Sequence, residues 1–196
     1  MHGLINRSLQ CFLRDTYGPS VWAAVAREAG LGFDGFEPML TYDPKLTEAV
    51  VEAASHLLHR PRDTVLEDLG TYLVSHPNMG APRRLLRFGG VGYADFLHSL
   101  EELPGRARLA LPELDLPALE LTDHSAADFT LICRSPLAGA AHVVVGLLRA
   151  MADDYGVLCL VEHRGHDQRG EVIGITLAET AFSPGRRFDL AAGGQG

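Results

Sequence analysis

The sequence predicts an α+β fold, with helices in the first two-thirds of the chain and strands in the last third. Apolar residues recur at helical spacing as far as about residue 103, and the alternation typical of strands begins near residue 119. The chain has 196 residues, 46% of them apolar, which is enough for one compact domain with a substantial core. We expect a single domain over residues 1–183, with a helical part at about 1–60, an α+β part at about 61–183 and a disordered tail at 184–196.

Prolines, glycines and capping residues mark where the expected helices begin and end. Asp43 and Pro44, for example, supply an N-cap and a first-turn proline for a helix that continues to Leu58. Ser20 is expected to cap the helix that stops at Gly30. The expected helical segments in this part of the chain are 4–18, 20–30, 43–58, 61–74, 82–88 and 93–103.

The last third of the chain contains the expected strands, at 119–121, 129–132, 157–161 and 172–177. A helix is expected at 139–155, between the second strand and the third. Polar residues at 123–127 and 164–170 are typical of turns and loops that join neighbouring strands. This order predicts a C-terminal antiparallel sheet with helices packed on it.

Composition excludes several classes of protein. The net charge is −8 and the one basic cluster, at 83–87, lies in an expected helix and is typical of a solvated face, so we expect no nucleic-acid binding. No apolar run approaches the ~18 residues of a membrane span, and we expect no signal peptide, because residues 2–4 lead directly into an amphipathic segment. The cysteines Cys11, Cys133 and Cys159 are widely spaced among apolar neighbours, which favours reduced thiols in a cytoplasmic protein.

Catalytic motifs are absent from the sequence. It has no Gly-x-Ser-x-Gly elbow, no phosphate-binding loop and no catalytic cysteine–histidine signature, so we expect no enzymatic activity. His163 and His166 are spaced so that both could bind a metal ion, but no second pair lies nearby, which favours a solvated hairpin loop. His56 and His59 form a similarly weak pair on an expected helix.

Five short motifs occur in a defined order along the chain. They are Met-x-Gly-x-Ile at 1–5, Tyr-Gly-x-x-x-Trp at 17–22, Leu-Gly-Thr-Tyr-Leu at 69–73, Phe-Leu-x-x-Leu-x-x-Leu at 96–103 followed by Pro117, and Ser-Pro at 135–136 followed by Gly139 and Gly146. In this order they resemble the H-NOX family, the haem-nitric oxide/oxygen binding domains, over roughly residues 1–177. The resemblance implies an N-terminal helical subdomain packed on the C-terminal sheet, and a pocket for haem b.

The chain departs from that family at the residues that hold haem. The family has its iron-binding histidine directly after the leucine that corresponds to Leu103, and here that residue is Pro104. The Tyr-x-Ser-x-Arg motif, which holds the haem propionates in the family, corresponds to Cys133, Ser135 and Leu137. Leucine cannot replace the bidentate hydrogen bonds that a guanidinium makes with a carboxylate. The resemblance therefore implies a haem pocket whose usual ligation is lost.

Haem b could still bind if another side chain reaches the iron. Imidazole is the usual ligand. His142, in the first turns of the expected 139–155 helix, is the first candidate, with His98 or His76 as alternatives. The resemblance implies a pocket lined by Ile5, Leu97, Leu100, Pro117, Cys133, Ser135 and Leu147.

The resemblance implies a regulatory function. Stand-alone members of the family act on a separate histidine kinase or cyclic-di-GMP enzyme (a diguanylate cyclase or phosphodiesterase), so we expect a nitric oxide sensor of this kind. Nitric oxide would change the iron coordination and shift the relative pose of the two subdomains. The alternative is a haem-free interaction module, whose pocket is filled by side chains or by another apolar ligand.

Overall fold

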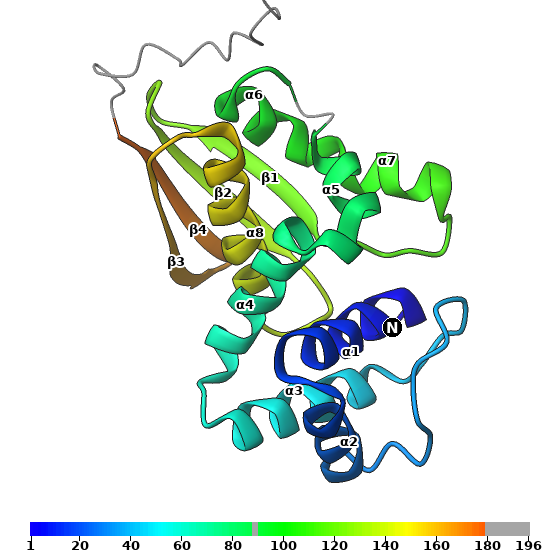
Figure 1. The fold of residues 1–196 in the computed structure, drawn as a ribbon. Coiled ribbons are helices and arrows are strands. Elements are labelled where there is room, and N and C mark those ends of the chain that lie inside the picture. Colours follow the sequence, from blue (N-terminus) through cyan, green and yellow to red (C-terminus); the bar gives the residue numbers. More distant parts are fainter. Residues whose placement is uncertain (88–89, 179–196) are drawn as a thin grey trace, which may run out of the picture.

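The computed structural model of the protein describes residues 1–87 and 90–178 and confirms the α+β class (Figure 1). The disordered tail expected at 184–196 lies outside the described residues. Within them, no helix has the length and apolar character needed to cross a membrane.

The helical segments are α1 Gly3–Tyr17, α2 Pro19–Glu28, α3 Pro44–Leu58, α4 Arg62–Ser75, η1 Pro77–Met79, α5 Gly80–Arg87, α6 Tyr93–His98, η2 Ser99–Glu102, α7 Leu103–Ala110 and α8 Ala140–Tyr155. The strands are β1 Ala118–Asp123, β2 Asp128–Arg134, β3 Cys159–Asp167 and β4 Gly170–Leu177.

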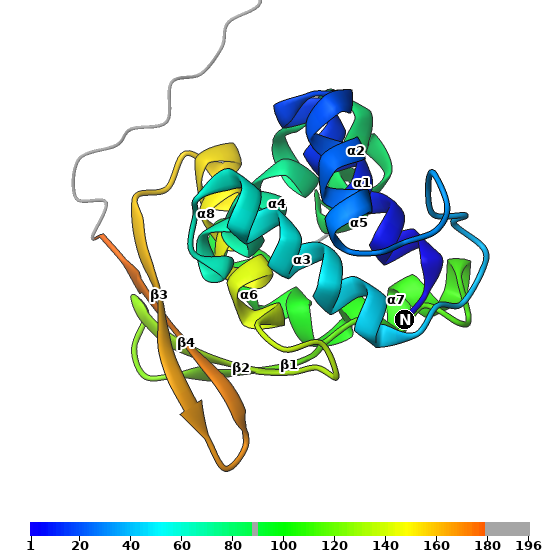
Figure 2. The same ribbon diagram turned by 90° about the horizontal axis from the view of Figure 1, so that it is seen from below.

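These four strands form one antiparallel sheet in the order β1-β2-β4-β3, and the helices lie on one side of it (Figure 2). β2 pairs with β1 along one edge and with β4 along the other. Its central residues, Leu131, Ile132 and Cys133, are buried, because a strand with neighbours on both sides has little contact with solvent. α8 connects β2 to β3, and it packs against β3 on one side and against α4 on another.

Buried apolar side chains form two clusters. The N-terminal cluster is built by α1 to α4 around Phe12 and Leu66. The C-terminal cluster fills the space between the sheet, α8 and the α6–α7 segment, around Phe96 and Leu131. α4 belongs to both, because Leu66 lies in the first cluster and Val74 in the second. α4 is therefore the element that joins the two parts of the molecule.

The contact between α4 and α8 is made by backbone against backbone. A Cβ atom added at Gly70 of α4 would lie within 3.0 Å of the Val143 carbonyl oxygen of α8. A Cβ atom added at Gly146 of α8 would lie equally close to the Glu67 carbonyl oxygen of α4. The two helices can approach this closely because each has a glycine at the crossing.

Two expected elements have different bounds in the structure. The helix expected at 93–103 is interrupted: α6 ends at His98, a 3₁₀ turn follows, and α7 begins at Leu103 with Pro104 in its first turn. Proline has no backbone N–H, so it is tolerated at the start of a helix and not in its interior. The helix expected to be capped by Ser20 instead begins at Pro19, with Gly18 as its N-cap.

The prediction of a loop over residues 164–170 is also wrong. β3 continues to Asp167, and only a short turn separates it from β4. The pairing shifts between His163 and His166, where Gly165 has a φ of 94°. A bulge of this kind inserts an extra residue into one strand, and a glycine readily adopts the required backbone conformation. His163 therefore lies in a strand and not in a solvated loop.

Asp15 links α1 to α4 through a polar network, and its ionisation is expected to stabilise the fold. Tyr72 Oη donates to Asp15 Oδ2 at 2.7 Å and Asn78 Nδ2 donates to the same oxygen at 3.0 Å. Burial alone would raise the pKa of Asp15, but these bonds and one from Arg14 lower it below its usual 3.8. A lowered folded-state pKa means that the ionised carboxylate adds stability above the pKa of the unfolded chain, and that this stability is lost as the pH falls through the folded value.

The free energy of unfolding of the wild type should therefore exceed that of Asp15→Asn at pH 7, and the difference should shrink as the pH falls below about 4. Denaturant titrations at several pH values measure this difference. Asp115→Asn is the matched control, because Asp115 is exposed and its pair with Arg108 lies on the surface. A wild-type advantage that is constant down to pH 2 would contradict the prediction.

Candidate functional site

The apolar residues expected to line a pocket do not all meet in one place. Leu97 and Leu100 are fully buried in the C-terminal cluster, and Leu147 packs against the same cluster. Cys133 of β2 also belongs to it. Ile5, in the first turns of α1, is half-buried and is a member of neither cluster among the described residues. Ile5 therefore contributes to neither packed core.

Pro104 and Leu137 occupy the two positions where the resemblance implies an iron ligand and a propionate-binding arginine. Pro104 is half-buried in the first turn of α7 and has neither a ligand atom nor an N–H to offer. Leu137 packs against the C-terminal cluster. Ser135 Oγ accepts a hydrogen bond from the Leu137 N–H at 3.1 Å, which closes a local turn after β2. The polar groups at this junction are therefore used within the chain itself.

Cys133 replaces the tyrosine of the same motif. The side chain is 1% exposed, and this burial raises the pKa of the thiol to about 12, with the nearby Glu171 carboxylate adding to the shift. The thiol is consequently neutral at physiological pH. A neutral thiol is a poor metal ligand, because the thiolate is the form that binds metals.

Cys133, Ser135 and Glu171 also line an open hollow of about 280 Å³ at the turn between β3 and β4. The rest of its lining is polar and comprises Arg134, His166, Gln168, Arg169 and Gly170. A hollow of this composition suits water and ions more than the apolar face of a porphyrin.

Two of the three histidines weighed as iron ligands lie at the surface. His98 is exposed, and its Nε2 lies 3.5 Å from Asp123 Oδ2. His76 stacks on Tyr72 with ring centroids 4.7 Å apart, and its Nδ1 accepts a hydrogen bond from the Asn78 N–H. His98 meets the C-terminal cluster only through an edge contact with Phe129, with ring centroids 6.2 Å apart, and the Tyr72 ring against His76 belongs to the N-terminal cluster.

Of the nine histidines, all of which lie in the described residues, only His2 and His142 are buried. His142 is 9% exposed and lies in the first turn of α8, where its N–H bonds to the Gly139 carbonyl oxygen. Five residues separate it from Leu147, so the two side chains point about 140° apart around the helix. His142 does not face the apolar residues expected around a haem.

His2 is a residue that the sequence patterns did not single out. It is 7% exposed and caps α1, because its Nδ1 accepts a hydrogen bond from the Leu4 N–H at 3.2 Å. Nε2 is therefore the nitrogen that carries the proton or binds another group. Histidine is an uncommon N-cap, so nothing in the local sequence predicted this arrangement.

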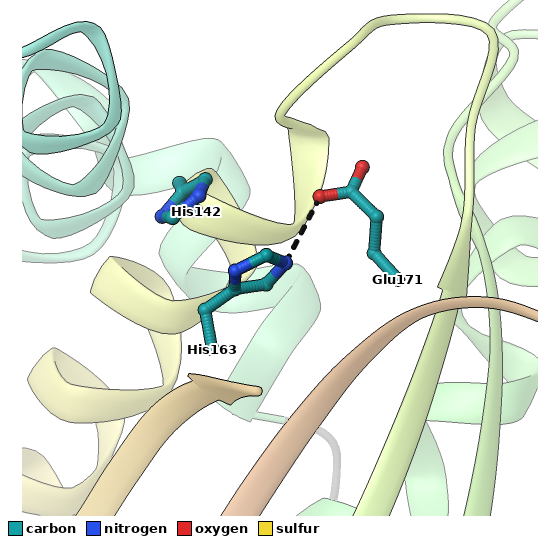
Figure 3. Close-up of side chains that lie close together, drawn as sticks. All are labelled: His142, His163 and Glu171. Atoms are coloured by element: carbon teal, nitrogen blue, oxygen red, sulfur yellow. Dashed lines mark ion pairs between the residues drawn. The ribbon is translucent and has the colours of Figure 1, made fainter. Parts of the chain in front are cut away.

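His142 instead belongs to a polar cluster with His163 and Glu171, which come from α8, β3 and β4 (Figure 3). One potential ligand atom from each of the three residues lies within 4.8 Å of the others. The two imidazole rings have centroids 4.4 Å apart, and His163 Nε2 lies 3.3 Å from Glu171 Oε2. We call these three residues the His–His–Glu cluster.

Two carboxylates of α4 lie against the ring nitrogens of His142. Its Nδ1 lies 3.3 Å from Glu67 Oε1, and its Nε2 lies 3.5 Å from Asp63 Oδ1. Glu67 is held in turn by Arg149, whose Nη1 donates to Glu67 Oε2 at 2.6 Å. Arg149 also donates to the Val161 carbonyl oxygen of β3. The imidazole of His142 is therefore fixed between two carboxylates and a second imidazole.

The sequence model of the Haem-NO-binding family matches residues 2–163 of the chain. Among curated proteins, the chain is 25% identical over 154 residues to soluble guanylate cyclase gcy-31 of Caenorhabditis elegans, covering 79% of this chain and 22% of that one. It is 22% identical over 155 residues to soluble guanylate cyclase 89Da of Drosophila melanogaster, covering 79% and 23%. The chain thus spans less than a quarter of the length of these relatives.

Solved structures with the same fold include the Fe(II) unliganded H-NOX protein from K. algicida, with a TM-score of 0.76 and 18% identity over 93% of this chain and 100% of that one. The H-NOX protein from S. oneidensis in the Fe(II)NO ligation state has a TM-score of 0.76 and 17% identity over 91% and 99%. At these identities the likeness shows the fold alone.

Proposed function

The chain belongs to the haem-NO-binding family, and from this premise we propose that it is a regulatory sensor domain that no longer holds haem through the family's residues and acts on a separate signalling protein. The curated relatives are guanylate cyclases, and the part of them that matches is less than a quarter of their length. This supports a sensory or regulatory role for the domain and not a catalytic one. The class of partner expected from the resemblance is a histidine kinase or a cyclic-di-GMP enzyme.

The observation that carries the proposal is the chemistry of the donor groups. Pro104 and Leu137 offer no ligand atoms, and Cys133 is a neutral, buried thiol. A haem needs an axial ligand for the iron and polar partners for two propionates, and these positions supply neither. The residues present therefore do not fit the group that the family binds.

Loss of haem leaves the two-part architecture intact. The N-terminal cluster and the C-terminal cluster are separate packed cores joined through α4. A ligand that binds differently to two relative poses of these parts shifts the population between them.

An absorption spectrum of the purified full chain after haem supplementation tests the proposal. We expect no Soret band at one equivalent of added haem. The matched variant Pro104→His restores an imidazole at the position where the resemblance implies the iron ligand. A Soret band in this variant and not in the wild type would show that the pocket remains large enough and that the missing ligand alone prevents binding.

The haem-binding alternative is favoured by one observation, the buried His2 with its Nε2 not used in capping α1. A wild-type Soret band that shifts with nitric oxide would overturn the proposal and establish a nitric oxide sensor with unusual ligation. His2→Ala and His142→Ala would then identify the ligand. The iron ligand is the histidine whose replacement abolishes the Soret band. We expect this histidine to be His2, because His142 is held by carboxylates of α4.

A further inference from the structure

We propose that the His–His–Glu cluster binds a divalent transition-metal ion, with zinc as the best fit. The inference rests on the geometry of the cluster and not on the proposed function, although Cys133, one of the residues expected around a porphyrin, pairs with Glu171 between β2 and β4. Two imidazoles and one carboxylate form a donor set that is common in zinc sites with three protein ligands. Calcium and magnesium, in contrast, prefer oxygen ligands throughout.

The fold positions the three residues on one side of the sheet. His163 of β3 pairs with Ile173 of β4, and Glu171 lies two residues from Ile173 on the same face of its strand. Ile173 is buried in the C-terminal cluster, so this face is the one that α8 covers. His142, in the first turn of α8, lies beside His163, which stands between His142 and Glu171 in Figure 3.

The distances suit a metal ion after small side-chain rotations. Zinc binds nitrogen and oxygen at roughly 2.0–2.2 Å, so ligand atoms of a tetrahedral site lie about 3.4 Å apart. His163 Nε2 and Glu171 Oε2 are already 3.3 Å apart. All separations within the cluster are at most 4.8 Å, and rotation of an imidazole can remove the excess over the ideal.

An unsatisfied nitrogen provides independent support. His163 Nε2 is shielded from solvent and has no hydrogen-bond partner among the described residues. The Glu171 carboxylate is near enough to pair with it but is not aligned for a hydrogen bond. A buried polar atom without a partner is unfavourable. A cation between the imidazole and the carboxylate would satisfy both groups.

Surrounding residues resemble the outer shell of a metal site. The Glu67 carboxylate at Nδ1 of His142 is the kind of partner that fixes the orientation of metal-bound histidines, and it leaves the other ring nitrogen for the metal. Arg149 holds Glu67 in place. Asp63, 63% exposed, lies on the solvent side of His142, where it or a water molecule would complete the coordination.

Zinc titration of the EDTA-stripped full chain, without an affinity tag, tests the inference by calorimetry and by metal analysis after dialysis. We expect one equivalent of zinc to bind and magnesium to leave the protein unchanged. His163→Gln should weaken zinc binding by about 100-fold or more, and Glu67→Gln, which acts through His142, by about 10-fold. The matched control is His166→Gln, because His166 lies on the same strand but is exposed and outside the cluster.

Cobalt provides a readout that does not depend on stability. Co²⁺ bound by two imidazoles and a carboxylate in a tetrahedral site gives an intense visible absorption, and we expect it in the wild type and in His166→Gln but not in His163→Gln. Circular dichroism establishes that each variant is folded before its affinity is compared. Substoichiometric zinc in the wild type, or equal zinc affinities in His163→Gln and His166→Gln, would overturn the inference.

Discussion

Alanine at Gly146 or at Gly70 is expected to destabilise the protein by about 3 kcal/mol, because overpacking typically costs about 1–3 kcal/mol and this site cannot relax. At both positions the new Cβ would lie closer than 3.0 Å to a backbone carbonyl oxygen of the facing helix. A backbone atom cannot rotate away as the end of a flexible side chain does. α4 and α8 would have to separate, and Val143, Leu147 and their neighbours would lose contacts on both sides.

Urea denaturation followed by circular dichroism measures this loss, with the midpoint and slope compared between variants. Gly105→Ala is the matched control. Gly105 lies in α7, is exposed, and would have no atom within 4 Å of an added Cβ. It is expected to stabilise the protein by up to about 1 kcal/mol, since alanine has the higher helix propensity. Similar midpoints for Gly146→Ala and Gly105→Ala would contradict the close crossing.

Cys133 is expected to react with iodoacetamide at least about 1,000-fold more slowly than a free thiol at pH 8, because the thiolate is the reactive form. Burial raises the pKa of this thiol to about 12, so the thiolate is a minute fraction of the population at that pH. The 1% exposed side chain also prevents the reagent from approaching. Mass spectrometry of digested protein, sampled over time, gives the rate at each cysteine separately.

The control for this experiment is the same reaction in concentrated urea, where Cys133 should react as fast as the other cysteines. Cys11, half-buried on α1, reports on a thiol in the native state outside the C-terminal cluster. Native-state labelling of Cys133 at the rate of Cys11 would show that the thiol is accessible. It would also restore Cys133 as a candidate metal ligand, which its neutral, buried state argues against.

The helix boundaries that could be predicted are those set by local chemistry. Asp43 was expected to cap a helix, and its side chain accepts a hydrogen bond from the Lys45 N–H as an N-cap does. The strand around Leu131 was evident from its apolar run. The extension of β3 through His163 was missed because residues 162–167 are polar on both faces of the strand, so the sequence has no apolar alternation there, although their burial in the edge strand does alternate.

The His–His–Glu cluster could not be predicted from spacing. His142 and His163 were each considered, but the first as an iron ligand and the second with His166 as its partner. Their proximity depends on the rotation of α8 above the sheet and on a bulge that changes the pairing of β3 with β4. Both are tertiary features that no single segment specifies. Glu171 has no distinguishing neighbours in the sequence at all.

The glycine crossing has a mechanical consequence. α4 cannot slide along α8, because a shift of one turn would bring a side chain to a place that has room only for hydrogen. α1 is also held to α4, through the hydrogen bond from Tyr72 to Asp15 and through the N-terminal cluster. The connection from α3 to α4 is three residues long, and its first, His59, has a left-handed backbone with a φ of 52°. A change in the orientation of α3 relative to α4 would require new backbone dihedrals at residues 59–61, whereas the glycine crossing excludes a displacement of α4 along α8.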